Sequence, residues 1–316
     1  MREKILRELK KSEFVSGETL AKKLKVSRTA IWKQIKSLKE IGYEIKSVKN
    51  KGYKLLKTPD ILIPEEIKHN LNTKVIGKEI KYFKKVDSTN KTVKEYLKNN
   101  ISEGTIFVSD IQIKGRGRKN RKWESPKGGL WFSVILYPNI TPDKAMFVTM
   151  TCSVAIAESI YEICKIKPVI KWPNDLLLDN KKVCGILTEL DAEIDRLNYI
   201  IIGIGINVNN ETKDALKNIA ISLKEKTNKN ISRVILLKNL LEKLDYYYDF
   251  LRNNKTNEIK KKWLDYSNII NKKISIIQEK EEFIGIVRDI GDNGCLKVEV
   301  DDEIKEIISG DIKYYK

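Results

Sequence analysis

The sequence is poor in the residues that carry two common kinds of chemistry. It has one histidine, His69, in 316 residues. A serine or cysteine nucleophile usually needs a histidine as its base, so no histidine-based catalytic triad can form. We expect His69 to lie on the surface of a polar helix. No Cys-x-x-Cys spacing occurs among the cysteines, which argues against a zinc site or a disulfide framework and fits a reducing cytoplasm. The four cysteines are Cys152, Cys164, Cys184 and Cys295.

Signals for a membrane or for secretion are also missing from the sequence. No apolar run approaches the roughly 20 residues of a membrane span. The first four residues, Met-Arg-Glu-Lys, do not resemble a signal peptide. The composition, 41% hydrophobic and 33% charged, is ordinary for a soluble globular protein. We therefore expect a cytoplasmic protein of two or three domains.

Positive charge, by contrast, is abundant and concentrated at one end. The formal net charge is +18, and residues 1–58 hold 17 Lys and Arg against 6 Asp and Glu. A basic module that accounts for +11 in under a fifth of the chain indicates a polyanionic partner. General basicity of the composition would not be concentrated in this way.

The basic segment has the pattern of a winged helix-turn-helix. Helical periodicity covers residues 1–15, Ser16 is a candidate N-cap for a second helix, and Ser27 for a third that ends at Gly42. Strand-like runs at 43–48 and 53–56 then form a hairpin. The third helix would enter a DNA major groove, and packing without DNA binding is the alternative. The residues expected to contact DNA are Arg28, Thr29, Lys33 and Lys36.

A loop rich in glycine and arginine, residues 115–123, lies between strand-like runs at 106–113 and 130–136. Its glycines are expected to take positive φ, so that backbone N–H groups converge on an anion. Its arginines match carboxylate or phosphate with two bonds, and Trp123 suits stacking on a base. The loop therefore predicts a ligand with negative charge and a flat ring. A plain nucleic-acid contact or a solvated loop is the alternative.

Three further motifs lie at ends of predicted strands. Residues 87–90 follow a strand, and on their own they are best explained as a helix N-cap, although they could aim two hydroxyls and an amide at a ligand. Residues 171–175 place a lysine, an amide and a carboxylate at the end of a short strand. Lys182 follows the turn of a hairpin at 179–180. A glycine-containing strand at 199–206 ends just before Asn207.

These motifs contain many cations and one obvious carboxylate, Asp175. Such a site suits reactions in which negative charge on phosphate must be stabilised. Asp175, with Asn174 or Asn207, could hold a Mg²⁺ that bridges phosphates. The strongest inference is nucleotide-dependent activation of a substrate. The cations are Arg116, Arg118, Arg121, Lys171 and Lys182.

The remaining chain predicts three helices and a β domain. The helices cover residues 144–164, 232–251 and 257–266, and from residue 273 short strands alternate with turns. We expect a small β-barrel-like domain there, without catalytic groups. The fold class is α+β, with a winged helix-turn-helix at 1–60, a mixed α/β domain at 61–271 and the β domain at 272–316.

In their order along the chain, these motifs resemble those of the biotin protein ligases. Together with the N-terminal module, the whole chain resembles the bifunctional class, which is both biotin–[acetyl-CoA-carboxylase] ligase and biotin operon repressor. The resemblance implies a class II synthetase-like central domain and an SH3-like C-terminal barrel. It also implies two steps: biotin and Mg·ATP give biotinyl-5′-AMP and pyrophosphate, and a lysine of the biotin carboxyl carrier protein then takes the biotin and releases AMP.

The same resemblance implies a role for each site residue. The expected catalytic residues are Lys171, Arg118 and Lys182. The expected contacts to biotin are Ser88, Thr89, Asn90, Gln112, Gly115, Arg116, Gly117, Arg118, Lys182 and Gly185. The expected contacts to ATP or the adenylate are Arg118, Arg121, Trp123, Asn174 and Asn207, with Asp175 as the Mg²⁺ ligand. Ile113 and Cys184 depart from the commonest residues of the family near the biotin pocket, and Trp32 prevents inference of the operator sequence by analogy.

The resemblance further implies partners and a switch. The loop at 115–123 would fold over the adenylate and shield it from water. The adenylate-bound protein would form a homodimer that presents two winged helices to operator DNA. Three rival functions are a ligand-sensing DNA-binding repressor without ligase activity, a lipoate or octanoate ligase, and a general RNA-binding protein. The intact cations argue against the first, and the glycine-arginine loop with the winged helix favours biotin.

Overall fold

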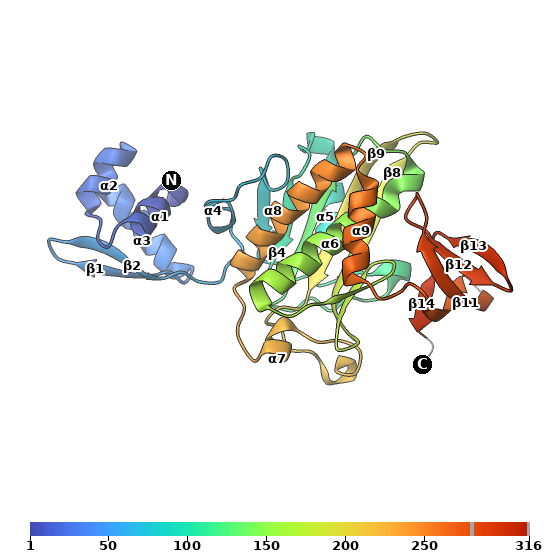
Figure 1. Ribbon diagram of the computed structural model, residues 1–316. Helices are drawn as coiled ribbons and strands as arrows, with labels where there is room; N and C mark the ends of the chain where they lie inside the picture. The colour runs from blue at the N-terminus through green and yellow to red at the C-terminus, as the bar shows by residue number, and fades with distance from the viewer. Residues whose placement is uncertain (279–280, 315–316) are drawn as a thin grey trace. The chain divides into compact units, whose positions relative to one another are not determined.

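The computed structural model describes residues 1–278 and 281–314, and they fold into two compact units, Met1–Leu71 and Asn72–Lys316 (Figure 1). The first unit ends eleven residues after the domain boundary expected from the sequence. The boundaries at 60 and 271 stay predictions, because compactness alone does not define where a functional domain ends.

The N-terminal unit has the predicted three helices and hairpin. The side chains of Ser16 and Ser27 accept hydrogen bonds from the backbone N–H groups of Thr19 and Ala30, so both act as N-caps. The apolar faces of the three helices pack on one another and on the hairpin. The elements are α1 (Arg2–Lys11), α2 (Gly17–Leu24), α3 (Arg28–Glu40), β1 (Glu44–Val48) and β2 (Gly52–Lys57).

A fourth helix completes this unit and ends before His69, which was expected to lie on a helix. Helix α4 covers only Pro64–Ile67, and His69 lies half-buried in the turn that follows, so its placement on a helix surface was wrong. The Glu66 side chain of α4 lies inside the unit, where it accepts hydrogen bonds from Tyr43 and Lys10. These bonds make α4 part of the N-terminal unit.

A mixed seven-stranded sheet forms the centre of the second unit. Its strand order is β3-β4-β5-β9-β8-β7-β6, in which only β3 and β4 are parallel neighbours. The long glycine-containing strand β9 lies at the middle, between β5 and β8. The strands are β3 (Ile80–Phe83), β4 (Ile106–Ser109), β5 (Leu130–Leu136), β6 (Val169–Lys171), β7 (Asp175–Leu178), β8 (Lys181–Ala192) and β9 (Leu197–Ile206).

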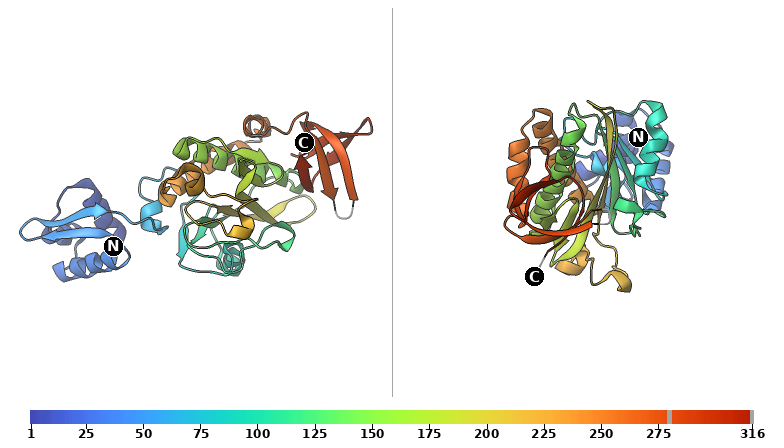
Figure 2. Two further views of the ribbon diagram at one scale, coloured as in Figure 1. Left: turned by 90° about the horizontal axis from the view of Figure 1, so that it is seen from below. Right: turned by 90° about the vertical axis from the view of Figure 1, so that its right-hand side faces the viewer.

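Helices cover both faces of this sheet (Figure 2). Helices α6, α8 and α9 pack together on one face, and α5 covers β4, β5 and β9 on the other. The short helix α7 was not predicted, because five residues are too few to show a helical period. The helices are α5 (Thr89–Tyr96), α6 (Ala145–Cys164), α7 (Leu223–Thr227), α8 (Arg233–Arg252) and α9 (Thr256–Tyr266), with short 3-10 helices at Leu97–Asn99, Arg118–Asn120, Pro142–Lys144 and Asp214–Leu216.

Helix α6 overturns the expectation that no apolar run approaches the length of a membrane span. The segment Pro142–Cys164 is long and apolar enough by composition, with a mean hydropathy of 1.3. However, 72% of its apolar window is buried inside the protein. A buried core helix passes the same test of length and composition, because it too is apolar around most of its circumference.

The C-terminal part is a five-stranded antiparallel sheet. Its order is β13-β12-β11-β10-β14, and the last strand, β14, was not predicted from the sequence. β14 pairs with β10, so the last strand in the sequence lies beside the first strand of this sheet. The strands are β10 (Lys273–Gln278), β11 (Glu281–Ile290), β12 (Leu296–Val300), β13 (Glu303–Ile307) and β14 (Asp311–Tyr314).

Candidate functional site

The site is built on a gap in one face of the central sheet. Asp175, Gly185, Gly205 and Trp131 are direct partners across β7, β8, β9 and β5. Residues opposite one another in a sheet project to the same face. The two glycines therefore leave a space without side chains, with a carboxylate on one side and a tryptophan on the other.

The indole of Trp123 lies in this space. A Cβ atom on Gly205 would come within 2.5 Å of Trp123 Nε1, and one on Gly185 within 3.3 Å of the same ring. Trp131 meets the indole edge to face, with ring centroids 6.5 Å apart. Gly115 lets the loop approach, because its Cβ would lie 2.4 Å from the carbonyl oxygen of Trp123. The glycines thus allow an aromatic ring to lie flat on the sheet.

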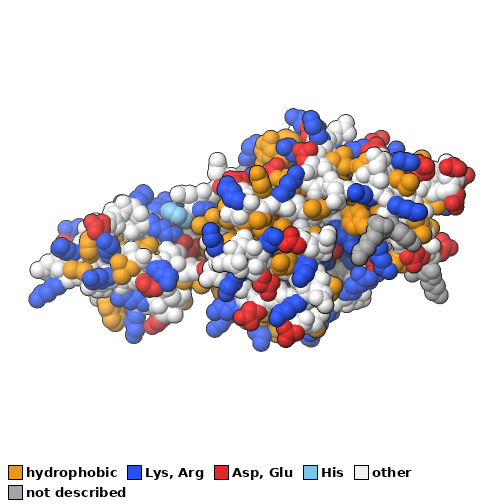
Figure 3. Space-filling model, turned by 60° about the horizontal axis from the view of Figure 1, so that its bottom comes forward, with side chains coloured by type: hydrophobic (Ala, Val, Ile, Leu, Met, Phe, Trp, Pro, Cys, Tyr) orange, Lys and Arg blue, Asp and Glu red, His pale blue; other side chains and the backbone are white. Residues whose placement is uncertain are grey.

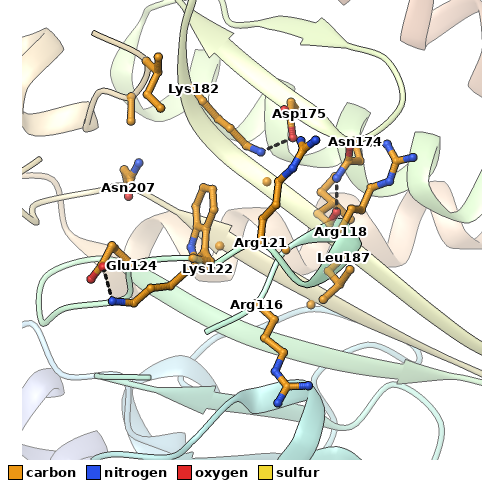
Figure 4. A pocket seen from close by; sticks show the side chains of 18 of the residues that line it. Arg116, Arg118, Arg121, Lys122, Glu124, Asn174, Asp175, Lys182, Leu187 and Asn207 are labelled. Atoms are coloured by element: carbon orange, nitrogen blue, oxygen red, sulfur yellow. Dashed lines mark hydrogen bonds and ion pairs between the residues drawn. The ribbon is translucent and has the colours of Figure 1, made fainter. Parts of the chain in front are cut away.

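A cavity of about 680 Å³ surrounds this indole. Every residue predicted for the ligase site lines it except Gly115, which acts through packing. Segments far apart in the sequence therefore meet at one place, as Figure 4 shows for part of the set. The predicted residues in the lining are Ser88, Thr89, Asn90, Gln112, Arg116, Gly117, Arg118, Arg121, Trp123, Lys171, Asn174, Asp175, Lys182, Gly185 and Asn207.

The backbone of the glycine-arginine loop differs from the prediction. Gly117 has φ −111°, and neither it nor Gly115 has positive φ. Lys119 and Asn120 take the left-handed conformation instead, with φ of 54° and 57°. Asparagine tolerates that region well, and the reversal brings the N–H of Gly117 to the carbonyl oxygen of Arg121. Gly115 serves close packing and not a left-handed turn.

Arg118 and Arg121 reach the C-terminal sheet. Arg118 donates to Asn174 Oδ1 and to the Gly310 carbonyl oxygen, both at 3.3 Å, and Arg121 lies 2.6 Å from Asp311 Oδ2. Burial lowers the pKa of Arg118, and the nearby carboxylates Asp311 and Asp175 oppose that shift. The C-terminal domain, expected to be without catalytic groups, contributes Gly310 and Asp311 to these contacts, just before and at the start of the unpredicted strand β14.

A lysine and a carboxylate form a close pair beside the indole. Lys182 Nζ lies 2.6 Å from Asp175 Oδ1 and 5.1 Å from the centroid of the Trp123 ring. The bulge between β7 and β8 places Lys182 next to Asp175. Lys171 is the direct partner of Asp175 across β6 and β7, so it projects to the same face of the sheet. Two lysines therefore flank one carboxylate.

The opposite end of the cavity is polar and largely hydrogen-bonded. Gln112 Oε1 accepts from the Thr89 backbone N–H at 2.8 Å and lies 3.1 Å from the Thr89 hydroxyl. Ser133 Oγ lies 2.6 Å from both Thr89 Oγ1 and Asn90 Oδ1. The Ser88 side chain makes no capping bond to helix α5, so the simple N-cap explanation of residues 87–90 was wrong. Gln112, from a distant loop, caps the helix in its place.

Arg116 lies apart from the other cations. Figure 4 shows its side chain directed away from Lys182 and Asp175. Its backbone pairs with Lys122 in an isolated bridge, which fixes the entrance of the loop. The structure therefore brings Arg118, Arg121 and the two lysines toward one end of the cavity and leaves the Arg116 guanidinium elsewhere on its lining.

A second loop lines the cavity and was missed entirely. Residues 210–220 follow Asn207, and the Asn210 amide donates to Asn207 Oδ1 at 3.1 Å. Lys213 and Lys122 both pair with Glu124, at 2.9 and 2.7 Å, and these bonds lower the pKa of Glu124. The sequence of this loop has no periodic pattern or motif. Its place in the site is evident only from the contact of Lys213 with Glu124, the residue that follows Trp123.

The described residues hold no cluster of three or more His, Cys, Asp or Glu that could bind a metal by itself. The cavity nevertheless provides the Asp175 carboxylate beside amide oxygens. Mg²⁺ is commonly held by one or two carboxylates together with substrate phosphates. The donor set therefore fits an ion that arrives with a nucleotide.

The N-terminal unit carries a separate candidate surface. Arg28, Thr29, Lys33 and Lys36 are all exposed on α3, as is Trp32. Arg28, Thr29 and Trp32 line a groove between α3 and the β1–β2 hairpin. Lys and Arg side chains are frequent on this unit in Figure 3. A cationic helix beside a hairpin is the arrangement with which winged helices contact DNA.

Comparisons with known proteins find matches in both units of the chain. Residues 82–207 match the biotin/lipoate A/B protein ligase family, and residues 1–54 match an HTH domain. The bifunctional ligase/repressor BirA of Bacillus subtilis is 40% identical over 307 residues, which cover 96% of this chain and 94% of that protein. The chain belongs to the bifunctional biotin protein ligases. The family and enzyme class expected from the motifs are thereby confirmed.

Other relatives agree with this assignment. The ligase is 31% identical to bifunctional ligase/repressor BirA of Escherichia coli over 98% of this chain and 95% of that one. A biotin protein ligase from Aquifex aeolicus, solved in complex with biotin and ATP, matches with a TM-score of 0.67 and 32% identity. That match covers 76% of this chain and all but 1% of the other. The protein is thus an ATP-dependent biotin ligase that also carries the DNA-binding unit of a repressor.

Proposed function

We propose that the cavity around Trp123 carries out both steps of biotin transfer. In the first, a biotin carboxylate oxygen attacks the α-phosphorus of ATP, which forms biotinyl-5′-AMP and expels pyrophosphate. In the second, a lysine amine of a biotin carboxyl carrier protein attacks the biotinyl carbonyl, which forms an amide, expels AMP and releases a proton. The cations at one end and the polar network at the other support this division of the cavity.

The hydrogen bonds of Thr89 carry the choice of substrate. Its hydroxyl proton is held within the protein, by Ser133 or by Gln112, so the hydroxyl offers lone pairs to a ligand. The ureido ring of biotin has N–H donors that match such an acceptor, whereas octanoate and lipoate have none. Ser88 makes no capping bond and can donate to the ureido carbonyl. This pattern favours biotin over the alternative acids.

Cations at the opposite end would stabilise the charge that develops on phosphate. The carboxylate and the triphosphate repel each other, and fixed positive groups in a partly enclosed cavity offset that repulsion. We assign Lys171 and Lys182 to the reacting α-phosphate and the carboxylate. Arg118, which Asn174 and the Gly310 carbonyl hold in place, would retain the adenylate, and Arg121 would bind the polyphosphate.

Asp175 is the residue that would hold Mg²⁺. When bound, the ion neutralises phosphate charge. Asp175 also pairs with Lys182 at 2.6 Å, which directs the lysine toward the cavity. Asn174 and Asn207 supply further oxygens near the phosphates. The two lysines that flank Asp175 would donate hydrogen bonds to phosphate oxygens.

Trp123 and the loop at 210–220 would bind the nucleoside and exclude water. The indole lies flat on the glycine gap and can stack on adenine. Glu124 joins the two loops through Lys122 and Lys213, which closes one side of the cavity. Exclusion of water protects a mixed anhydride from hydrolysis. We propose that this closure retains the adenylate until the carrier arrives.

The N-terminal unit would connect biotin supply to transcription. We propose that the adenylate-bound ligase forms a homodimer through its central sheet, and that the dimer binds operator DNA through α3 with Arg28, Thr29, Lys33 and Lys36. We place both activities in the cytoplasm, where carrier protein and DNA are accessible. Operator binding that does not change with biotin and ATP would contradict this coupling.

Biotin-dependent release of pyrophosphate from Mg·ATP tests the proposed substrate. Biotin should support release by the purified protein, and octanoate and lipoate should not. A subsequent chase with carrier protein should convert the adenylate to biotinylated carrier and AMP. Release with octanoate at a rate similar to that with biotin would overturn the substrate assignment, and no release with any acid would favour a ligand-sensing repressor.

A further inference from the structure

Ser133 is a buried hydroxyl that lies behind the polar end of the cavity. It is fully buried in β5 and is not part of the cavity lining. Its Oγ touches Thr89 Oγ1 and Asn90 Oδ1 at 2.6 Å each. The facing residue on β9 is Gly203, and a Cβ there would lie 2.4 Å from Asn90 Oδ1. The absent side chain makes room for Asn90 to reach the serine.

Glu189 determines which way the Asn90 amide points. The Asn90 amide nitrogen donates to Glu189 Oε2 at 2.7 Å and to the Leu187 carbonyl oxygen at 3.4 Å. Lys94 pairs with the same carboxylate at 2.9 Å, which holds it in place. The Glu189 carboxylate and the Leu187 carbonyl can only accept hydrogen bonds, so the amide nitrogen must face them and the Asn90 oxygen must face Ser133.

Ser133 has one proton for two neighbouring oxygens, which allows only two arrangements of the hydrogen bonds among Ser133, Thr89 and Asn90. When Ser133 donates to Asn90, its short contact with Thr89 requires Thr89 to donate to Ser133. When Ser133 donates to Thr89, the Thr89 proton goes to Gln112 Oε1, 3.1 Å away. The first arrangement leaves Thr89 Oγ1 and Gln112 Oε1 as two acceptors 3.1 Å apart, whereas the second leaves Ser133 Oγ and Asn90 Oδ1 as two acceptors only 2.6 Å apart, which favours the first. In both, Thr89 faces the cavity with lone pairs.

We propose that Ser133 is a positioning and specificity-determining residue: with Glu189 and Asn90 it fixes the Thr89 hydroxyl as an acceptor for an N–H group of the substrate. This inference rests on the proposed function of the cavity. Ser133 touches no substrate and acts only through Thr89. Without Ser133, the Thr89 proton has only Gln112 Oε1, at 3.1 Å and already bonded to the Thr89 backbone N–H, as an acceptor. The proton can then also point into the cavity, where it would oppose a ureido N–H and would tolerate a ligand that lacks one.

The test compares Ser133→Ala with the unaltered ligase by pyrophosphate release. We expect the KM for biotin to rise about five- to tenfold, as for the loss of one buried hydrogen bond. The kcat and the KM for ATP should stay within about twofold. The preference for biotin over biotin methylated at either ureido nitrogen should fall about fivefold for one of the two analogues, because the acceptor at Thr89 is no longer enforced.

Two further variants separate positioning from a structural role. Ser159→Ala removes an equally buried hydroxyl, which bonds to the Ala155 carbonyl oxygen within α6, and should change no kinetic constant. Glu189→Gln lets the Asn90 amide turn over, and should raise the KM for biotin in the same direction without removing Ser133. If Ser133→Ala does not fold, Glu189→Gln tests the same inference.

The outcomes distinguish this inference from the proposed function. Equal rises in the KM for biotin and for ATP, or an unchanged preference against the methylated analogues, would show that Ser133 is merely structural and would overturn the inference. If the unaltered ligase itself releases no pyrophosphate with biotin, the proposed function fails first.

Discussion

The two units present their functional residues in opposite ways. In the N-terminal unit, the residues proposed to contact DNA are exposed and lie on one helix, α3. In the second unit, the lining of the cavity extends from Ser88 to Lys313, on strands and loops of two sheets. A large polyanion needs only a charged surface, whereas a reactive small molecule must be surrounded. The residues of a DNA-binding surface can therefore be neighbours in the sequence, whereas the residues that enclose a small molecule must come from distant segments.

The largest effect is expected for Lys171→Gln. Removal of a cation proposed to act on the α-phosphate should lower kcat for pyrophosphate release about 10²- to 10³-fold. Operator binding by the N-terminal unit should not change when preformed adenylate is supplied. Lys167→Gln is a suitable control, because its Nζ lies over the Tyr266 ring, outside the cavity. An unchanged kcat would show that Lys171 is only part of the lining.

Arg118→Gly should weaken retention of the adenylate more than its formation. The lost guanidinium bonds are charge-assisted, so we expect release of the adenylate to quicken about 10- to 100-fold. Activated biotin would then label stray lysines, which a blot for biotin on a bystander protein would detect. Normal retention without stray labelling would show that another residue holds the adenylate.

Gly205→Ala tests whether the glycine gap is required. The added Cβ would lie 2.5 Å from Trp123 Nε1, and displacement of a packed ring costs about 1–3 kcal/mol. We expect the KM for ATP to rise about tenfold and the tryptophan fluorescence to change. Gly17→Ala is the matched control, because its Cβ would meet the Tyr53 ring at an ordinary 3.4 Å, away from the cavity. Equal behaviour of the two variants would contradict a special role for the gap.

Lys33→Gln addresses the other side of the comparison. Loss of one phosphate contact should weaken operator binding and reduce the slope of log K against log salt by about 0.9. Pyrophosphate release should be unaffected, because α3 lies in the separate N-terminal unit. Lys11→Gln, an exposed lysine on α1, should leave the slope unchanged. A loss of ligation in Lys33→Gln would show that the units are not independent.

The smallest effect concerns Asp311 and pH. Burial alone would raise the pKa of Asp311, but hydrogen bonds from Arg121 and Lys119 outweigh it and lower the pKa. The folded pKa then lies below the value of about 3.9 in an unfolded chain. The pairs stabilise the fold above about pH 4, and this contribution is lost as the pH falls through the folded pKa.

Thermal unfolding of Asp311→Asn measures this contribution. At pH 7 the variant should be less stable by at most about 1 kcal/mol, since the partners are largely exposed. Near pH 3 the difference from the unaltered protein should shrink. A difference that is constant from pH 7 to pH 3 would assign the effect to packing instead of charge.

Local signals in the sequence predicted much of the fold. Ser16 and Ser27 were identified as caps because the capping bond joins residues three apart. Strand β5 was predicted to the residue, since its apolar run lies between Gly129 and Pro138. Strand β14 was missed because Asp311–Tyr314 is too short to show a period and is held by pairing with β10. The length of helix α4 was not predictable, because the four residues Pro64–Ile67 are too few to show a helical period.

The composition of the candidate site was also predictable, but not its arrangement. All the site residues named by motif resemblance, except Gly115, line the cavity. The resemblance gave no sign that Asp311 meets the glycine-arginine loop, that Gln112 caps helix α5, or that Glu124 joins two loops. Each of these contacts links residues from separate elements of the fold. A contact of that kind leaves no mark on the residues beside either partner.

By itself, the sequence determined the family, the winged helix and the chemistry of the cavity, because caps, periodicity and motifs are properties of neighbouring residues. The tertiary structure decided the direction of the hydrogen bonds and the space available. Gly185 and Gly205 became a platform for Trp123 only when β8 and β9 paired in register. Ser133, an unremarked residue of a buried strand, gained a role because folding placed it between Thr89 and Asn90.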